Sequence, residues 1–198
     1  MCDHNTIDET GQKILFTQAR THNAWQDKDV SDDVLKALFD LTKWAPTSAN
    51  CSPMRLKFVK SQAAKDKLKP FLMEGNVDKT MGAPVTAIIG HDMEFYEHLP
   101  RLFPHTDAKS WFVGNDQMIA DTAFRNGTLQ GGYLMMAARA LGLDCGPMSG
   151  FDADGVKDAF FPGDAVVVNF LCNLGYGDEK ALHPRSPRFD FDDVAEIL

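Results

Sequence analysis

A long helical pattern in the second half of the chain constrains the fold most. It runs from Asp116 to Leu141, and small or apolar residues recur along it at the steps of three and four that define one helix face. The stripe comprises Ala120, Ala123, Gly127, Gly131, Leu134, Ala138 and Leu141. Each glycine costs a helix about 1 kcal/mol relative to alanine, so close approach of another backbone should compensate. The helix is therefore expected either to lie in the core of its own chain or to pack against its twin from a second subunit.

The remaining patterns predict short helices and strands in no regular alternation. Ser31 is expected to cap a helix that runs through Trp44 and ends near Pro46, and Asp152 to cap another that ends at Phe160. Further elements are a helix over Ala63–Phe71 and strands over Arg55–Val59, Pro84–Gly90, Leu143–Met148 and Ala165–Tyr176. The prediction is a mixed α+β fold with about four strands among helices, in one domain spanning residues 1–198.

Composition excludes several classes of protein. The net charge of −8 argues against a general nucleic-acid surface, and no apolar run approaches the length of a membrane helix. The first residues, Met1 to Asn5, lack the apolar core of a signal peptide, so a cytoplasmic location is expected. Cys2, Cys51, Cys145 and Cys172 form no C-x-x-C pair and are expected to be free thiols. The six histidines are scattered, which argues against a multi-histidine metal site.

The common nucleotide-binding and hydrolase fingerprints are absent. The sequence contains no G-x-G-x-x-G after a strand, no G-x-x-x-x-G-K-[ST] and no G-x-S-x-G. Any ligand must therefore be held by less familiar groups.

Four polar clusters are candidates for those groups. Residues 19–25 place a cation, a hydroxyl and an amide close together, as phosphate binding requires, although a solvated helix end would look the same. Residues 44–53 set small polar side chains between two prolines, which suits a heteroaromatic ring edge or a capped helix end. Residues 145–151 carry glycines that let a backbone approach a ligand, although a plain strand-to-helix turn would look the same. Lys180, Arg185 and Arg188 form a basic tail that suits phosphate binding or is simply solvated.

The order of these clusters resembles the nitroreductase superfamily of flavoproteins over essentially the whole chain. The corresponding motifs are Arg20-Thr21-His22-Asn23, Pro46-Thr47-Ser48-Ala49-Asn50-Cys51-Ser52-Pro53, Asn76-Val77-Asp78-Lys79, Pro147-Met148-Ser149-Gly150, and Arg185 with Arg188. The runs ARTHNAW, KWAPTSANCSP, EFYEHLP, LFPHTDAKSWF, ALGLDCGPMSGFD and LGYGD are similar to the malonic semialdehyde reductase branch of pyrimidine utilisation.

The resemblance implies tightly bound FMN, NADH or NADPH as co-substrate, and an intertwined homodimer with shared active sites. Arg20, Thr21, His22 and Asn23, with Arg185 and Arg188, would surround the FMN phosphate. The partner subunit would line the flavin ring with Pro46, Thr47, Ser48, Ala49, Asn50 and Ser52. Asn76 and Lys79 would reach the pyrimidine edge of the ring, and Pro147, Met148, Ser149 and Gly150 would lie along it, with a backbone N–H near Ser149 or Gly150 facing flavin N5.

The sequence departs from the family pattern in three places. Asn23 stands where the family often has a basic residue, Ser52 where Gln is usual, and Ser149 where many members carry Glu. No separate protein acid is evident, so no catalytic residue is assigned.

The resemblance leaves three functions open. The first is reduction of 3-oxopropanoate to 3-hydroxypropanoate by ping-pong hydride transfer, with Arg101, His105 or Lys109 as candidates to bind the substrate carboxylate. The second is a broad nitro- or quinone-reductase. The third is a flavin- or partner-binding module without turnover.

Overall fold

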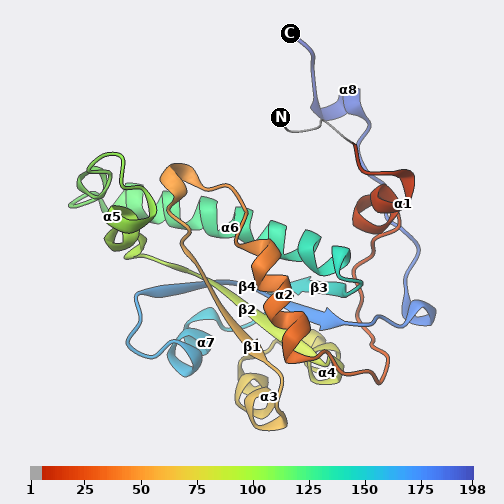
Figure 1. The fold of residues 1–198 in the computed structure, drawn as a ribbon. Helices are drawn as coiled ribbons and strands as arrows, with labels where there is room; N and C mark the ends of the chain where they lie inside the picture. The colour runs from red at the N-terminus through yellow and green to blue at the C-terminus, as the bar shows by residue number, and fades with distance from the viewer. Residues whose placement is uncertain (1–5) are drawn as a thin grey trace.

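Four strands pair into one antiparallel sheet in the order β1-β2-β4-β3 (Figure 1). The strands are β1 (Met54–Val59), β2 (Val85–Asp92), β3 (Asp144–Met148) and β4 (Val166–Gly175). The computed structural model describes residues 6–198. β1 and β3 are the two edges of the sheet. Both strands lie close to the ranges predicted from the sequence.

Helices cover both faces of the sheet (Figure 1). They are α1 (Glu9–Gln12), α2 (Asp32–Thr42), α3 (Gln62–Leu68), α4 (Glu74–Gly82), α5 (Leu99–Leu102), α6 (Asp116–Ala140), α7 (Ala153–Phe160) and α8 (Phe191–Val194). Shorter helical turns are η1 (Lys13–Thr17), η2 (Ser48–Asn50), η3 (Lys69–Phe71), η4 (Phe95–His98), η5 (Lys109–Trp111) and η6 (Glu179–Ala181). The predicted α+β fold with four strands flanked by helices is confirmed.

The two cores follow from the alternation of side chains along the strands. Ala87 and Ile89 of β2 pack with α2 and α6, whereas Ile88 between them packs with α3 and α7. Successive side chains of a strand point to opposite faces, so one buried apolar strand serves both cores.

Local capping signals place two helices as predicted. The Ser31 hydroxyl accepts a hydrogen bond from the Val34 N–H at 3.3 Å, and the Asp152 carboxylate accepts one from the Gly155 N–H at 3.1 Å. These contacts satisfy N–H groups that have no partner within the helix.

α4 is a helix that the local sequence patterns do not predict. Gly75, Asn76, Asp78 and Gly82 are weak helix formers, so local propensity gives little signal there. Tertiary packing supplies the missing stability: Thr80 is buried, and its hydroxyl lies 3.4 Å from the Met148 sulfur.

The small-residue stripe of α6 faces its own sheet. A Cβ added at Gly127 would lie 2.8 Å from the His91 Cβ, and one added at Gly131 would lie 2.6 Å from the Phe170 ring. Ala123, Leu134 and Ala138 are fully buried within the same chain. The stripe therefore allows close helix–sheet packing, and it does not supply a surface for a twin helix.

Two other expectations concern membranes and cysteines. Within residues 6–198, no helix is both long and apolar enough to cross a membrane. Cys51, Cys145 and Cys172 are buried and unpaired, as predicted, and Cys2 lies outside the described residues.

Candidate functional site

The N-terminal loop lies along the edge strand β3. Thr21 forms a bridge with Cys145, and the His22 N–H donates to the Cys145 carbonyl at 3.0 Å. A Cβ at position 146 would come within 2.6 Å of the His22 carbonyl oxygen, so only glycine allows this approach. The predicted phosphate cluster and the predicted glycine turn are thereby neighbours.

Two side chains of this loop hold it in place. The His22 ring is buried beneath Gly177, and its Nε2 lies 3.4 Å from the Asp144 carboxylate. The Trp25 indole N–H donates to the Lys79 carbonyl at 2.9 Å and ties the loop to α4. His22 thus stabilises the loop from within, whereas the neighbouring Thr21 and Asn23 are exposed.

The turn after β3 is fixed by Asn76. The Asn76 amide donates to the Gly150 carbonyl at 2.7 Å, and the Met73 N–H donates to the same oxygen at 3.1 Å. Among residues 6–198, no acceptor pairs with the N–H groups of Ser149 and Gly150. These two donors, and the Asn76 amide oxygen, remain available to a ligand.

Cations gather around the same edge. Arg20 donates to the His183 carbonyl, and Arg185 donates to the Thr17 and Ala19 carbonyls at 3.0 Å each. The C-terminal tail is thereby attached to the N-terminal loop. Lys79 makes no ion pair with any carboxylate in the described part of the chain.

Arg188 does not join this group. Its guanidinium donates to the carbonyls of Ser186 and Pro187 at 3.0 and 2.9 Å, within its own exposed segment. The structure therefore brings Arg20 and Arg185 together but leaves Arg188 outside.

A hollow of about 390 Å³ opens beside the turn after β3. Its lining is mostly apolar and consists of Thr128, Gly132, Met135, Pro147, Met148, Ser149 and Phe170. An apolar surface beside free backbone donors suits a flat heteroaromatic ring with polar edges.

The proline-bounded loop lies elsewhere in the chain, before β1. Ala49, Asn50 and Ser52 adopt φ angles of 49°, 50° and 40°, a left-handed conformation that is uncommon outside glycine. The buried Asn126 of α6 holds the loop, because its side-chain oxygen accepts from the Ser48 N–H at 2.8 Å. The exposed members of the loop are Pro46, Ser48 and Asn50, whereas Thr47, Ala49 and Ser52 are half-buried.

The predicted residues thus fall into two separate groups. The first follows the β3 edge and comprises Arg20 to Asn23, Asn76, Lys79, Pro147 to Gly150 and Arg185. The second is the loop of residues 46–52, at the β1 edge. Three strand spacings, about 14 Å, separate the two edges, so one chain does not unite the groups.

Sequence reasoning missed Asn126 and Gln130. The Gln130 side-chain oxygen accepts from the Met54 N–H at 2.9 Å, so the two amides fix both ends of the segment that enters β1. The available signal was their spacing: two amides four residues apart share one helix face with an otherwise apolar stripe.

The three candidate carboxylate binders differ in their surroundings. The Lys109 ammonium lies 2.6 Å from the Glu97 carboxylate, and this hydrogen bond raises the pKa of Lys109. The His105 ring packs edge-on against Phe103 at 5.5 Å between centroids. Arg101 is exposed on α5.

Cys51 lies inside the loop but is not a reactive thiol. It is fully buried among aromatic residues, and burial raises the pKa of its thiol to about 11. Thiolate chemistry at neutral pH is therefore disfavoured.

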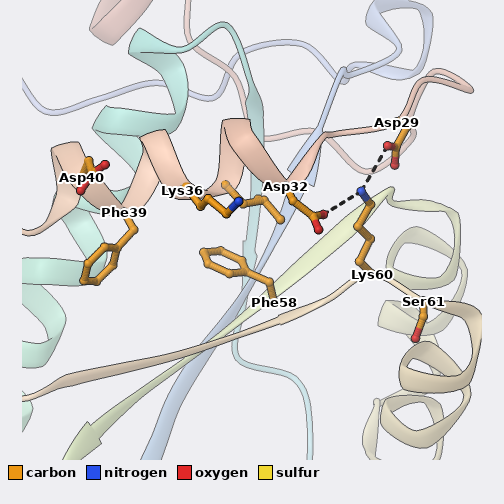
Figure 2. A pocket seen from close by; sticks show the side chains of 9 residues that line it. Asp29, Asp32, Lys36, Phe39, Asp40, Phe58, Lys60 and Ser61 are labelled. Atoms are coloured by element: carbon orange, nitrogen blue, oxygen red, sulfur yellow. Dashed lines mark hydrogen bonds and ion pairs between the residues drawn. The ribbon is translucent and has the colours of Figure 1, made fainter.

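A groove lined by α2, β1 and the segments beside them contains none of the predicted site residues. Figure 2 shows it between α2 and β1, with Phe39 and Phe58 facing its interior. Lys60 spans its mouth and pairs with Asp29 at 3.2 Å and Asp32 at 3.1 Å, so these polar groups already satisfy one another. Residues 6–198 also contain no group of three or more His, Cys, Asp or Glu side chains suited to a metal ion.

Comparisons with known proteins identify the family of the chain. The model of the nitroreductase family matches residues 17–176. A protein of Burkholderia lata named "Putative NADH dehydrogenase/NAD(P)H nitroreductase" is 65% identical over 97% of this chain and 98% of its own length. A protein of the same name from Polynucleobacter asymbioticus is 60% identical over 98% of this chain and 99% of its own.

A solved structure supports the fold. The crystal structure of a "putative nitroreductase in complex with FMN" from Exiguobacterium sibiricum superposes with a TM-score of 0.85 at 21% identity, covering 98% of this chain and 99% of that one.

The fold and the family match define an oxidoreductase class. The chain belongs to the nitroreductase family, as its motifs indicated.

Proposed function

We propose that the chain is an FMN-dependent NAD(P)H oxidoreductase that works as a homodimer and reduces 3-oxopropanoate to 3-hydroxypropanoate. The division of the predicted site supports this proposal most directly. The β3 edge and the 46–52 loop belong to opposite edges of one sheet, so a second copy is needed to place a loop beside a β3 edge.

The residues at the β3 edge fit FMN. Arg20 and Arg185 supply cations for a phosphate in a chain of net charge −8, and the hollow beside Pro147–Ser149 offers an apolar surface for the ring. The free N–H groups of Ser149 and Gly150 suit the polar acceptors of the ring.

Bound FMN would supply hydride transfer from the nicotinamide to the acceptor. Asn76, oriented by its bond to Gly150, would present its amide oxygen to the pyrimidine edge of the ring. Lys79 would stabilise negative charge on that edge, because its ammonium has no competing carboxylate among the described residues. One shared site would receive nicotinamide and acceptor in turn, which predicts ping-pong kinetics.

The second candidate is a broad NAD(P)H nitro- or quinone-reductase. The names of the Burkholderia and Polynucleobacter relatives favour it. Both candidates use the same FMN site and differ only in the acceptor.

Spectroscopy tests the proposed class of enzyme. Purified protein should show flavin absorption that bleaches when NADH or NADPH is added without oxygen. A colourless protein that does not bind added FMN would contradict both candidates and favour a partner-binding module.

Steady-state kinetics then separates the two candidates. The aldehyde proposal expects kcat/KM for 3-oxopropanoate to exceed that for nitroaromatics and quinones. Reduction of the latter two with no turnover of 3-oxopropanoate would favour the second candidate.

A further inference from the structure

We propose that Arg101, on α5, binds a carboxylate of the electron acceptor and makes the site prefer small anionic acceptors over neutral ones of the same reactivity. This inference rests on the proposed function and concerns its substrate class.

Arg101 lies in α5, which is hydrogen-bonded to the loop of residues 46–52. The Asn50 side-chain amide donates to the carbonyl of Leu102, the next residue, at 2.8 Å. Leu99 anchors α5 in a cluster that also contains Cys51 and packs against Ala49. α5, which carries Arg101, is therefore attached to the loop that is proposed to lie over the partner's flavin.

Two ionisable side chains near Arg101 in the chain already face carboxylates. Lys109 lies 2.6 Å from Glu97, and His98 lies 3.8 Å from Asp92. Within residues 6–198, the Arg101 guanidinium has no hydrogen bond or ion pair. Of the three candidates from the sequence, Arg101 is thus the cation that retains its full donor set.

Charge and geometry both favour a carboxylate as its ligand. The chain carries a net charge of −8, so its overall field repels an anionic acceptor unless a local cation offsets it. A guanidinium offers parallel N–H donors that match the two oxygens of a carboxylate. A neutral acceptor gains less from this group, because only a charged acceptor makes a fully charge-assisted pair with it.

A pair of nitro acceptors, one anionic and one neutral, provides the test, and the comparison of wild type with variants removes their difference in intrinsic reactivity. With FMN-loaded enzyme and NAD(P)H, we expect wild type to show a lower KM for 4-nitrobenzoate than for its methyl ester. Arg101→Ala should raise KM for 4-nitrobenzoate about tenfold or more and leave the methyl ester within about twofold, because a charged hydrogen-bonded contact is lost. Arg101→Lys should recover part of the loss.

The control variant is Lys36→Ala. Lys36 pairs with Asp33 on the exposed side of α2, so its loss changes net charge without touching α5. We expect it to change neither KM. The pair 3-oxopropanoate and propanal should respond in the same way as the nitro compounds.

Binding without turnover separates this inference from the proposed function. 4-Nitrobenzoate can be titrated into FMN-loaded protein by calorimetry in the absence of NAD(P)H. Equal affinity for 4-nitrobenzoate and its ester, or equal losses of both in Arg101→Ala, would overturn the inference. Tight, Arg101-dependent binding of 4-nitrobenzoate without turnover of any acceptor would support it and contradict the proposed enzyme.

Discussion

The loop before β1 holds an unusual set of backbone angles. Ala49, Asn50 and Ser52 are left-handed without being glycine, and each such residue costs about 1 kcal/mol or more. The conformation persists because other groups hold it: the Thr47 hydroxyl accepts from the Ser52 N–H at 3.1 Å, and Asn126 accepts from the Ser48 N–H. Strain maintained in this way is typical of a ligand-binding segment.

Asn126 should therefore control the binding of FMN without touching it. We expect Asn126→Leu to destabilise the fold by about 1–3 kcal/mol, because the part-buried hydrogen bond from the Ser48 N–H to the buried Asn126 side chain is lost. FMN affinity, measured by fluorescence titration, should fall with it. Gln117→Ala, on the exposed start of the same helix, is the matched control. Unchanged FMN affinity in Asn126→Leu would show that the loop does not contribute to the site.

His91 should make stability depend on pH. It is buried against Gly127 and Phe124, and burial lowers its pKa below the ordinary value of 6.5. Below about pH 6.5 the unfolded chain binds a proton at His91 that the folded chain does not, so stability falls as pH falls. Above that pH neither state is protonated and the contribution is constant.

Urea unfolding at several pH values checks this expectation. The stability of wild type relative to His91→Gln should decline between pH 7 and pH 5, by at most about 1.4 kcal/mol per pH unit. His183→Gln, at an exposed position of the tail, is the matched control. A stability difference that stays constant from pH 5 to pH 8 would contradict the assignment.

At the scale of elements, α6 organises both groups of site residues. Its inner face carries the glycines that let it approach β2 and β4 and the amides that hold the loop before β1. Part of its outer face lines the hollow beside the turn after β3. One helix therefore fixes the distance between the two groups within a chain.

Substitution of the inner glycines tests this packing. Gly127→Ala should destabilise the protein by about 1–3 kcal/mol, because the new Cβ would lie 2.8 Å from the His91 Cβ, which cannot rotate away. Gly75→Ala is the matched control in α4, where nothing lies within 4 Å and alanine should stabilise the helix by about 0.5–1 kcal/mol. A Gly127→Ala variant of unchanged stability but altered oligomeric state would instead support the twin-helix interpretation.

At the scale of the whole molecule, apolar side chains remain exposed in several regions, and two of these regions bear on assembly. The outer face of α6 exposes Phe124 at 55%, Leu129 at 50% and Tyr133 at 45% of their surfaces. The C-terminal segment with α8 extends away from the sheet and its helices (Figure 1) and exposes Phe189 and Phe191. Contiguous apolar surface of this kind marks an interaction site, and a second copy of the chain is the proposed occupant.

A charge on the outer face of α6 should disrupt the dimer. We expect Leu129→Glu to shift the protein from dimer to monomers of 22.0 kDa and to weaken FMN binding in parallel. Sedimentation equilibrium and flavin absorbance report the two effects. Lys69→Glu, beside α3 on the other side of the sheet, should leave both unchanged. Wild-type protein that is monomeric with FMN bound would refute the shared site.

The local sequence predicted most elements because their signals are local. Ser31 and Asp152 start helices through their own side chains, and the β-branched run of β4 is a strand in almost any context. α4 escaped prediction because Gly75 and Gly82 weaken its propensity, and only packing around Thr80 makes it a helix. Asn126 escaped as a site residue because its partner, Ser48, lies 78 positions away in the chain.

By itself, the sequence determined the fold class, the family and the chemical groups offered to a ligand. Helix caps, strand patterns and ordered motifs depend on residues that are close together in the sequence. The tertiary structure decided which of these groups lie together. It placed Arg20, Asn76 and Gly150 at one edge of the sheet and the loop of residues 46–52 at the other. It also decided which face of α6 is outward, because small residues at helical spacing suit a sheet or a second helix equally, and only the position of β2 and β4 distinguishes them.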